Sequence, residues 1–395
     1  MHVVYTGEEA PSAVKKSIFL AGPSPRRPTD PNWREDAIVA LERMGYDGVV
    51  YAPIWRGGPP SESGKPFNYD GQVKWETRYL NECDVIVFWV PRDMKTLPAL
   101  TTNVEFGMWL TSGKVVLGYP EEAEHMKYMD WWAKQENVPI HDSLYGTLAT
   151  AVAKLGDGAP RSGGERDIPL HVWNRQDFKT WYAAQKGVGN RLDGAKVLWS
   201  FRVGNNRVFM LSLHVNVYIK RENRNKINEF VLFRPDISTI VAYCPPGVID
   251  GQLAIPGTEV VLIKEFRSPA NNPDAMVYEV PGGSSPKPGV LPGVTASEEF
   301  HEETGLKIQA SRFRHVGVRQ VAATAMAFRA HCYAVELLPV EMEELKAEMG
   351  EVAHGNHGDS EYTFVLVSKV SDMLKNPNID WSNIGMVYQA LSQDA

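Results

Sequence analysis

Four short apolar runs within residues 1–156 constrain the fold of this chain more than any other feature. They are Ser17 to Ala21, Gly48 to Pro53, Asp84 to Val90 and Lys114 to Gly118. Polar residues do not alternate along them, so they predict strands that are buried on both faces. The stretches between them have helical periodicity, which is clearest from Pro31 to Met44. We therefore expect residues 1–156 to form a doubly wound α/β domain with a parallel sheet, Rossmann-like or flavodoxin-like.

The chain changes texture after this first domain. Gly156 to Gly164 is rich in glycine, which predicts a linker, and we assign residues 157–195 to a linker and interdomain segment. From Val197 to Phe266, short runs of Val, Ile, Phe and Tyr are broken by turn residues, a pattern typical of antiparallel strands. A Gly/Pro-rich loop, an acidic helix, further strands and a C-terminal helix follow. Residues 196–395 are thus expected to form an α+β domain that opens with a β-rich segment.

Composition bears on location and on the class of partner. No apolar run approaches the roughly 20 residues that a membrane-spanning helix needs, so no membrane contact is expected. Three widely spaced cysteines suit reduced thiols and a cytoplasmic location. A net charge of -7 argues against binding to a nucleic-acid backbone, but it leaves a small nucleotide substrate open. Homo-oligomerisation is also left open.

An acidic helix is predicted from Ser297 to Gly305, where the glycine ends it. Glu299, Glu302 and Glu303 are related by steps of three and four residues, so their carboxylates converge on one helical face. Such a face repels itself unless a cation binds it, and a hard divalent ion with oxygen ligands is the natural occupant. By spacing alone, a solvated surface helix explains the same residues equally well.

Three segments of this half resemble the Nudix family, most closely its ADP-ribose and nucleotide-sugar pyrophosphatase branch. They are Glu259 to Arg267, Glu279 to Gly283 and Glu299 to Gly305, within a resemblance that covers roughly residues 195 to 390. It implies a Nudix fold that hydrolyses a nucleoside diphosphate compound with Mg²⁺ or Mn²⁺.

The same resemblance implies roles for individual residues. Those implied to bind the metal are Glu299, Glu302, Glu303 and the carbonyl of Gly282. Those implied to contact the substrate are Arg267, near its phosphates, and Glu279. The implied base is Glu361, with Asp359 as the second choice, although an ordinary polar loop explains His354 to Glu361 equally well. The sequence departs from the family pattern at Glu298, where the family has Arg, and in Ser284 to Val294, which contains no acid.

In the first half, Thr101 to Gly107 follows a buried strand at the edge of the sheet where open α/β sheets bind ligands. We expect Glu105 in the first turn of a helix, where the macrodipole stabilises a carboxylate. Such a group can act as a nucleophile toward an anomeric carbon. By spacing alone, Thr102 and Glu105 are better explained as a helix capping box without catalytic meaning.

Four segments of this half resemble the nucleoside 2-deoxyribosyltransferase superfamily. They are Ile18 to Pro23, Trp75 to Asp84, Val85 to Val90 and Thr102 to Gly107. The resemblance implies that Glu105 is the nucleophile and that Glu76 orients or assists it. The residues implied to contact the substrate are Gly22, Pro23, Asn103 and Arg26, with Arg26 or Arg27 meeting a 5′-phosphate. The family carries an Asp where this sequence has Ala99, and Asp93 is the nearby acid.

Together the two resemblances imply a bifunctional nucleotide-processing enzyme. Its first domain would cleave or transfer at an N-glycosidic bond, and its second would hydrolyse an ADP-ribose-like substrate with Mg²⁺. Removal of the base from NAD yields ADP-ribose, which would link the two reactions. The alternative is a nucleotide-binding sensor with weakened catalysis, which Glu298 and Ala99 favour.

Overall fold

The computed structural model describes residues 1–25, 32–56, 68–204, 207–246, 248–249, 252–285, 289–356, 358 and 360–393. Backbone contacts divide the chain into two compact units, residues 1–233 and residues 234–395. Each unit has its own sheet and its own core.

The first unit contains a six-stranded sheet in which every strand pair is parallel. In spatial order the strands are β1 (His2–Tyr5), β4 (Val49–Ala52), β3 (Ser17–Ala21), β5 (Val85–Trp89), β6 (Val115–Gly118) and β7 (Ile140–His141). From β4 to β7 the order is the 2-1-3-4-5 arrangement of flavodoxin-like sheets, with β1 added at the edge. The expected parallel α/β class is therefore confirmed, and the strand order selects its flavodoxin-like form.

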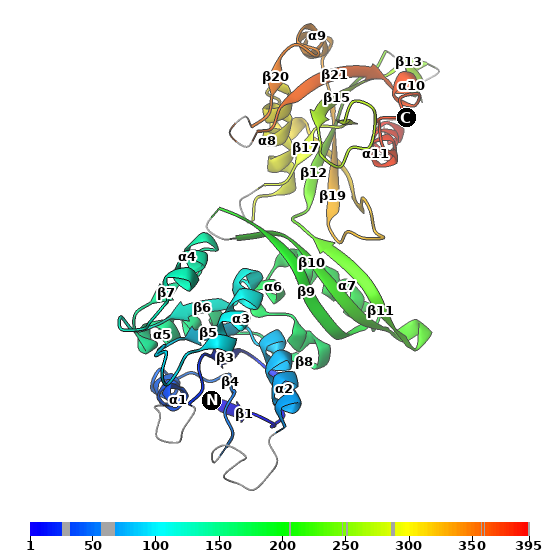
Figure 1. Cartoon of the computed structure of the whole chain (residues 1–395). Helices are drawn as coiled ribbons and strands as arrows, with labels where there is room; N and C mark the ends of the chain where they lie inside the picture. The colour runs from blue at the N-terminus through cyan, green and yellow to red at the C-terminus, as the bar shows by residue number, and fades with distance from the viewer. Residues whose placement is uncertain are drawn as a thin grey trace. The chain divides into compact units, whose positions relative to one another are not determined.

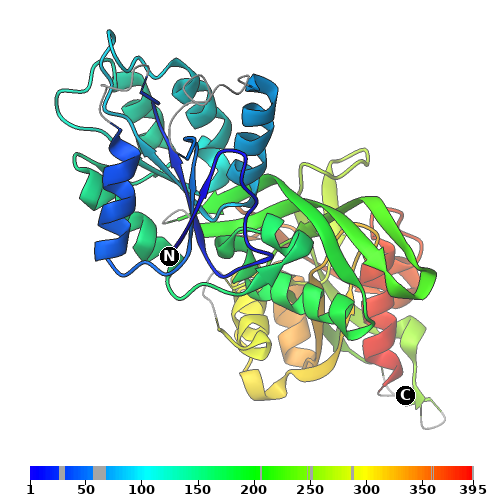
Figure 2. The ribbon, with the colours of Figure 1, turned by 90° about the horizontal axis from the view of Figure 1, so that it is seen from below.

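Helices cover both faces of this sheet, as a doubly wound fold requires (Figures 1 and 2). One face packs against α1 (Trp33–Arg43) and α5 (Leu144–Leu155), through side chains such as Leu41 and Leu148. The other face packs against α2 (Tyr69–Glu82), α3 (Leu100–Trp109) and α4 (Lys127–Gln135), through side chains such as Tyr79, Phe106 and Met129. Because β3 and β5 are buried along their whole length, the sheet is a rigid platform for the loops at its ends.

The segment expected to be a linker is instead a folded part of the first unit. Within residues 157–195, β8 (Arg161–Ser162) pairs with β2 (Ala13–Val14), and α6 (Leu170–Trp173) and α7 (Gln176–Gly187) follow. The buried Arg161 guanidinium forms an ion pair with Asp84, 2.6 Å between Nη2 and Oδ2. The glycines that indicated a linker form tight turns, since Gly156, Gly158 and Gly163 all have positive φ.

The β-rich segment also groups with the first unit rather than with the second. It forms an antiparallel sheet of β9 (Arg191–Val203), β10 (Arg207–Ile219) and β11 (Arg224–Phe233). The Asp167 carboxylate accepts a hydrogen bond of 2.9 Å from the N–H of Ala195 in β9, which ties this sheet to the preceding segment. The division of the chain therefore falls after residue 233, not after residue 195 as the change of texture indicated.

The second unit is built on a mixed eight-stranded sheet. Its continuous order is β18 (Arg314–Gln320), β19 (Arg329–Glu336), β12 (Ile237–Cys244), β15 (Glu259–Phe266), β21 (Thr363–Lys369) and β20 (Ala353–His354). Two short strands complete it: β16 (Met276–Glu279) pairs with β15, and β17 (Gly282–Gly283) pairs with β12. A separate hairpin joins β13 (Val248–Ile249) and β14 (Gln252–Leu253). The β12–β19 pair is parallel and the other pairs are antiparallel.

Helices cover both faces of this second sheet as well. Ile240 and Ala242 face α8 (Pro292–Thr304) and α9 (Pro339–Ala347), whereas Val241 and Tyr243 face α10 (Val370–Met373) and α11 (Trp381–Ser392). This alternation is the period of two that a strand between two helical layers requires. None of the described helices is long and apolar enough to cross a membrane.

Candidate functional site

The carboxyl ends of β3 and β5 approach each other closely in the first unit. A Cβ atom added to Gly22 would lie 2.2 Å from the carbonyl oxygen of Trp89 and 2.8 Å from the Trp33 ring, so only glycine fits there. Gly22 also has a φ of 151°, which L side chains rarely adopt. The chain reverses its winding between β3 and β5, and open α/β sheets bind ligands at such a point.

A buried arginine, Arg34 of α1, fixes the loop that follows β3. Its guanidinium donates hydrogen bonds to the carbonyl oxygens of Leu20 (3.0 Å), Gly22 (2.7 Å) and Pro23 (3.1 Å). Because the Arg34 side chain is only 1% exposed, water does not compete for these hydrogen bonds, and they fix the backbone of the loop. The sequence analysis did not single out Arg34, since a charged residue in the first turn of an amphipathic helix is ordinarily solvated.

Two carboxyl groups lie near this loop, Glu105 on α3 and Glu76 on α2. The pKa of Glu105 is raised to about 7, chiefly by burial and also by the negative charge of Glu76, while the positive charge of Arg34 opposes the shift. Burial also raises the pKa of Glu76, against a hydrogen bond from Gln72 (2.8 Å) and the charge of Arg34. The structure thus brings together Gly22, Pro23, Glu76 and Glu105, which the sequence had placed at one site.

The helical position of Glu105 differs from both interpretations of the sequence. Helix α3 begins at Leu100, with Ala99 as its N-cap at a φ of 54° and no capping hydrogen bond from a side chain. Thr102 is inside the helix and Glu105 is its sixth residue, so the capping-box interpretation is wrong. Glu105 is also outside the first turn, where a macrodipole effect is strongest. The dominant influence on its carboxyl group is burial.

Asn103 and Asp93 are engaged in local structure. Asn103 accepts a hydrogen bond through its side-chain oxygen from the buried Arg92, which also donates to the carbonyl oxygen of His125 (3.0 Å). Asp93 accepts from the N–H groups of Lys95 and Thr96, 2.9 and 2.8 Å away, and so closes a turn. The Asp93 carboxylate therefore stabilises this turn by accepting both hydrogen bonds. Arg26 and Arg27 lie outside the described residues.

The comparisons with known proteins bear on this part of the chain. Residues 15–123 match the family model described as "nucleoside 2-deoxyribosyltransferase like". The match supports a nucleoside 2-deoxyribosyltransferase-like domain over these residues. The matched segment includes Gly22, Arg34, Glu76 and Glu105. No curated protein matches the chain.

The second unit has its own cluster of acidic groups. One carboxylate oxygen each from Glu265 of β15, Glu303 of α8 and Glu361 lies within 4.8 Å of the others. Glu303 is 2% exposed and accepts a hydrogen bond of 2.8 Å from the N–H of Gly282. Burial raises the pKa of Glu303 well above its usual value, and burial raises that of Glu265 to about 7. We call Glu265, Glu303 and Glu361 the acidic cluster.

The other residues expected at a metal site surround this cluster. Glu299 lies against Gly283, and the pKa of its carboxyl group is raised to about 7, chiefly by burial and also by the negative charges of Glu302 and Glu361. The Glu302 residue is exposed. The contact of Gly282 with Glu303 is made through its N–H rather than its carbonyl. Asp359 and His357 lie outside the described residues.

Arg267 is the counter-ion of the acidic cluster. Its Nη2 atom lies 2.8 Å from a carboxylate oxygen of Glu265, 3.7 Å from Glu361 and 3.8 Å from Glu279. Glu279 is also partly buried, which raises the pKa of its carboxyl group. The guanidinium therefore offsets part of the repulsion among these carboxylates.

Glu265 is the member of the acidic cluster that the sequence analysis missed. It is 4% exposed and lies near the end of β15, a strand whose other buried residues are Val, Leu and Ile. The signal was present, since Glu265 falls two residues after Ile263 and four after Val261, and side chains two apart in a strand share one face. An acid on the buried face of a strand is unusual enough to mark a site.

Proposed function

We propose that the first unit breaks N-glycosidic bonds of nucleosides or nucleotides, with Glu105 as the nucleophile. The observation that carries this proposal is the Glu105–Glu76–Arg34 arrangement at the carboxyl ends of β3 and β5. In the step proposed, a Glu105 oxygen bonds to C1′ as the bond from C1′ to the base nitrogen breaks. The electron pair leaves with the base, which takes up a proton. Water or a second base then displaces Glu105 from C1′ and loses a proton.

The test is release of free base from a panel of nucleosides and 5′-nucleotides, followed by chromatography and mass analysis. We expect Glu105→Ala to lower the rate at least 1000-fold, because the nucleophile is lost. Glu122→Gln is the matched control, since Glu122 is an exposed carboxylate of the same unit. Base release by the Glu105→Ala protein at the wild-type rate would exclude Glu105 as the nucleophile.

For the second unit, we propose a Nudix-type fold that hydrolyses the pyrophosphate of a nucleoside diphosphate compound. The acidic cluster supports a site for Mg²⁺ or Mn²⁺, because its donors are three carboxylates close enough to share one ion. Burial is the main cause of the raised pKa values of Glu265, Glu299 and Glu303, and neighbouring carboxylates add to each of them, so a cation bound here would favour the ionised forms. A bound divalent ion would neutralise pyrophosphate oxygens and lower the pKa of an attacking water.

In this second proposal, the residues of the site have separate roles. Glu265, Glu303 and Glu361 would hold the ion, and the N–H of Gly282 fixes the position of the Glu303 carboxylate. Arg267 would exchange its carboxylate partners for a substrate phosphate. The test is hydrolysis of ADP-ribose and nucleotide sugars with Mg²⁺ and with a chelator. We expect Glu303→Gln to abolish the metal-dependent rate, whereas Glu343→Gln, at an exposed position of the same unit, retains it.

The two proposed reactions would form a sequence on one substrate. Loss of the base from NAD leaves ADP-ribose, whose pyrophosphate the second unit would split into AMP and ribose 5-phosphate. Incubation with NAD and Mg²⁺ should then yield nicotinamide and AMP, and Glu303→Gln should stop the reaction at ADP-ribose. Neither nicotinamide nor AMP would appear if the pairing were wrong.

A nucleotide sensor is the second candidate, favoured by two local features. Glu298 is exposed beside Glu299 and raises the pKa of that carboxyl group, where the resemblance implies an arginine. Ala99 stands where the resemblance implies an acid. Tight binding of a nucleotide by wild type, Glu105→Ala and Glu299→Gln, with no turnover by any of them, would establish the sensor.

A further inference from the structure

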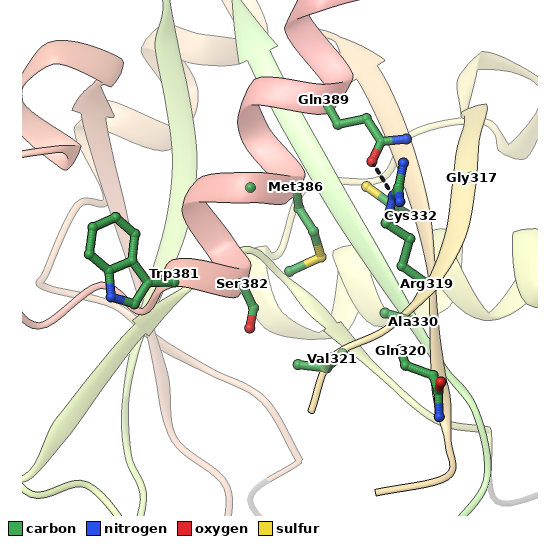
Figure 3. A pocket seen from close by; sticks show the side chains of 11 residues that line it. Gly317, Arg319, Gln320, Val321, Ala330, Cys332, Trp381, Ser382, Met386 and Gln389 are labelled. Atoms are coloured by element: carbon green, nitrogen blue, oxygen red, sulfur yellow. Dashed lines mark hydrogen bonds between the residues drawn. The ribbon is translucent and has the colours of Figure 1, made fainter. Parts of the chain in front are cut away.

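A cavity of about 280 Å³ lies in the second unit between α11 and the strands β18 and β19 (Figure 3). Its volume is at the lower end of small-molecule sites, so it suits one ring system rather than a whole dinucleotide. Met386 extends from α11 toward the strands that carry Ala330 and Cys332, and these side chains give the cavity an apolar interior (Figure 3).

The polar groups of the cavity are mostly neutral. Amide and hydroxyl groups come from Gln320, Gln389 and Ser382. Arg319 is the one charged residue among those that line it, and its Nε–H donates to the neutral side-chain oxygen of Gln389 at 2.8 Å. An apolar interior edged by amides and a hydroxyl matches a flat, uncharged ring with its own donors and acceptors. A metal ion would find no carboxylate among the lining residues.

Gly385 indicates that this space is kept open. It lies in the interior of α11 and lines the cavity, and a Cβ atom built there would have no heavy atom within 4 Å. Glycine destabilises a helix interior relative to alanine. The chain thus loses helix stability at Gly385 although an alanine there would meet no steric clash. A flat ring that packs against the backbone of α11 would occupy the space that a side chain at position 385 would fill.

The cavity is connected to the acidic cluster through a short path of contacts. The Thr239 hydroxyl donates to the sulfur of Met386 at 3.2 Å, and Thr239 is the register partner of Gly282 in the β12–β17 pair. Gly282 in turn donates its N–H to Glu303. The start of α11 is fixed to the same loop, because the Asn383 side chain accepts from the N–H of Val280 at 2.9 Å. The cavity lies on the α11 face of the sheet and Glu303 comes from α8 on the other face. One nucleotide that fills both sites therefore has to pass the end of the sheet where β17 pairs with the start of β12.

We propose that the cavity between α11 and strands β18 and β19 binds the base of a nucleoside diphosphate compound, while the acidic cluster holds its pyrophosphate. This inference rests on the pyrophosphatase activity proposed for the second unit. It adds the subsite that would select the nucleoside. Met386 and Cys332 contribute sulfur atoms, which make favourable contacts with aromatic rings.

The experiment measures binding of adenosine, guanosine, cytidine and uridine to the full-length Glu105→Ala protein by calorimetry, without metal. Nucleosides carry no phosphate, so this binding does not depend on the acidic cluster, and the Glu105→Ala change removes the turnover proposed for the first unit. We expect at least one nucleoside to bind, and Gly385→Leu to weaken its binding at least 10-fold by filling the cavity. Gly107→Ala is the control for the effect of a side chain on an open mid-helix glycine, because a Cβ there would also meet nothing within 4 Å.

Thermal unfolding of Gly385→Leu and Gly385→Ala shows whether the helix is intact, and both should be at least as stable as wild type. Binding of no nucleoside would overturn the proposal, as would a Gly385→Leu protein that binds the same number of nucleosides with the same affinities as the protein with Gly385. Binding of an acyl-chain amphiphile in place of any nucleoside would overturn it too. If Gly385→Leu weakens nucleoside binding but the wild-type protein hydrolyses no diphosphate compound, the proposed hydrolase function fails and the base subsite stands.

Discussion

At the scale of single residues, the ionisation of Glu105 links function to stability. Its pKa of about 7 lies above the ordinary value of 4.5, chiefly because the carboxyl group is buried. A group with a raised folded-state pKa binds its proton more tightly when the protein is folded. Its contribution to stability is therefore complete below about pH 4.5 and is lost as the pH rises through 7. Ionisation of Glu105, which the proposed nucleophilic role requires, therefore lowers the free energy of unfolding.

We predict that Glu105→Gln stabilises the protein at pH 8 but not at pH 5. The difference in pKa corresponds to at most about 3 kcal/mol of unfolding free energy, since one pKa unit is 1.36 kcal/mol. Urea unfolding of both proteins at the two pH values measures it. Glu122→Gln, at an exposed position, should show no such dependence on pH. A Glu105→Gln protein less stable than wild type at pH 8 would contradict the proposed burial of the charge.

Arg34 is expected to control the pH dependence of base release. Its positive charge opposes the rise in the Glu105 pKa, so Arg34→Met should raise that pKa further and move the acid limb of the rate profile above pH 7. Arg34→Lys keeps the charge but loses hydrogen bonds to the loop after β3. Its acid limb should stay near that of wild type while its rate falls. Equal shifts in both variants, with circular dichroism showing intact folds, would contradict the electrostatic role.

The sequence predicted these residues unevenly, and the reason is physical. The resemblance to the nucleoside 2-deoxyribosyltransferase superfamily placed Glu105, Glu76 and Gly22 at one site, whereas spacing alone favoured a capping box for Glu105. Arg34 and Glu265 are functional candidates because of burial, at 1% and 4% exposed. Burial depends on which elements pack over a residue. A single sequence predicts the burial of a charged residue only where the residues beside it follow the apolar pattern of a buried helix or strand.

At the scale of elements, the end of α8 shows how one glycine shapes the second site. Gly305 ends the helix with a φ of 73°, as the sequence predicted. A Cβ atom there would lie 2.6 Å from the His354 ring, which packs against the end of the helix. Both the left-handed backbone and the close contact therefore require glycine.

We predict that Gly305→Ala lowers the free energy of unfolding by about 2–4 kcal/mol, from backbone strain of about 1–2 kcal/mol plus the clash. Gly350→Ala is the matched control, because Gly350 has a φ of 74° but open space around its Cβ position. It should show the strain alone. Chemical denaturation of both variants measures the difference, and equal losses would mean that His354 moves aside without cost.

The bounds of a buried strand were easier to predict than the beginnings of helices. The strand Ser17–Ala21 has the predicted bounds, because the residues on either side interrupt the apolar run. Helix α8 begins at Pro292, before the acidic stretch that predicted it, although proline at a first helical position is a common start. Helix α3 begins after Ala99 in a left-handed conformation, which alanine rarely adopts. The surrounding fold determines that start.

At the scale of the whole chain, the buried pair of Asp84 and Arg161 explains why the first unit continues past residue 156. Asp84 precedes β5 and accepts hydrogen bonds from Ser17, Arg161 and the N–H of Leu170. Neither charged side chain is more than 1% exposed. A glycine-rich stretch predicted a boundary between these two residues, since composition records where the chain turns but not which distant charges it must bring together.

A fragment of residues 1–156 should therefore fail to fold cooperatively, whereas residues 1–233 should fold as one unit. The shorter fragment leaves Asp84 buried without its cation, and breaking such a pair costs about 3–5 kcal/mol, a large part of the stability of a domain. The longer fragment retains Arg161 and the sheet of β9 to β11. Thermal unfolding followed by circular dichroism distinguishes them.

Asp84→Asn in the full chain tests the cause, because it removes the ion pair without cutting the chain. If the shorter fragment unfolds cooperatively near the temperature of the longer one, residues 157–233 are an appendage, and the first unit ends where the glycines indicated.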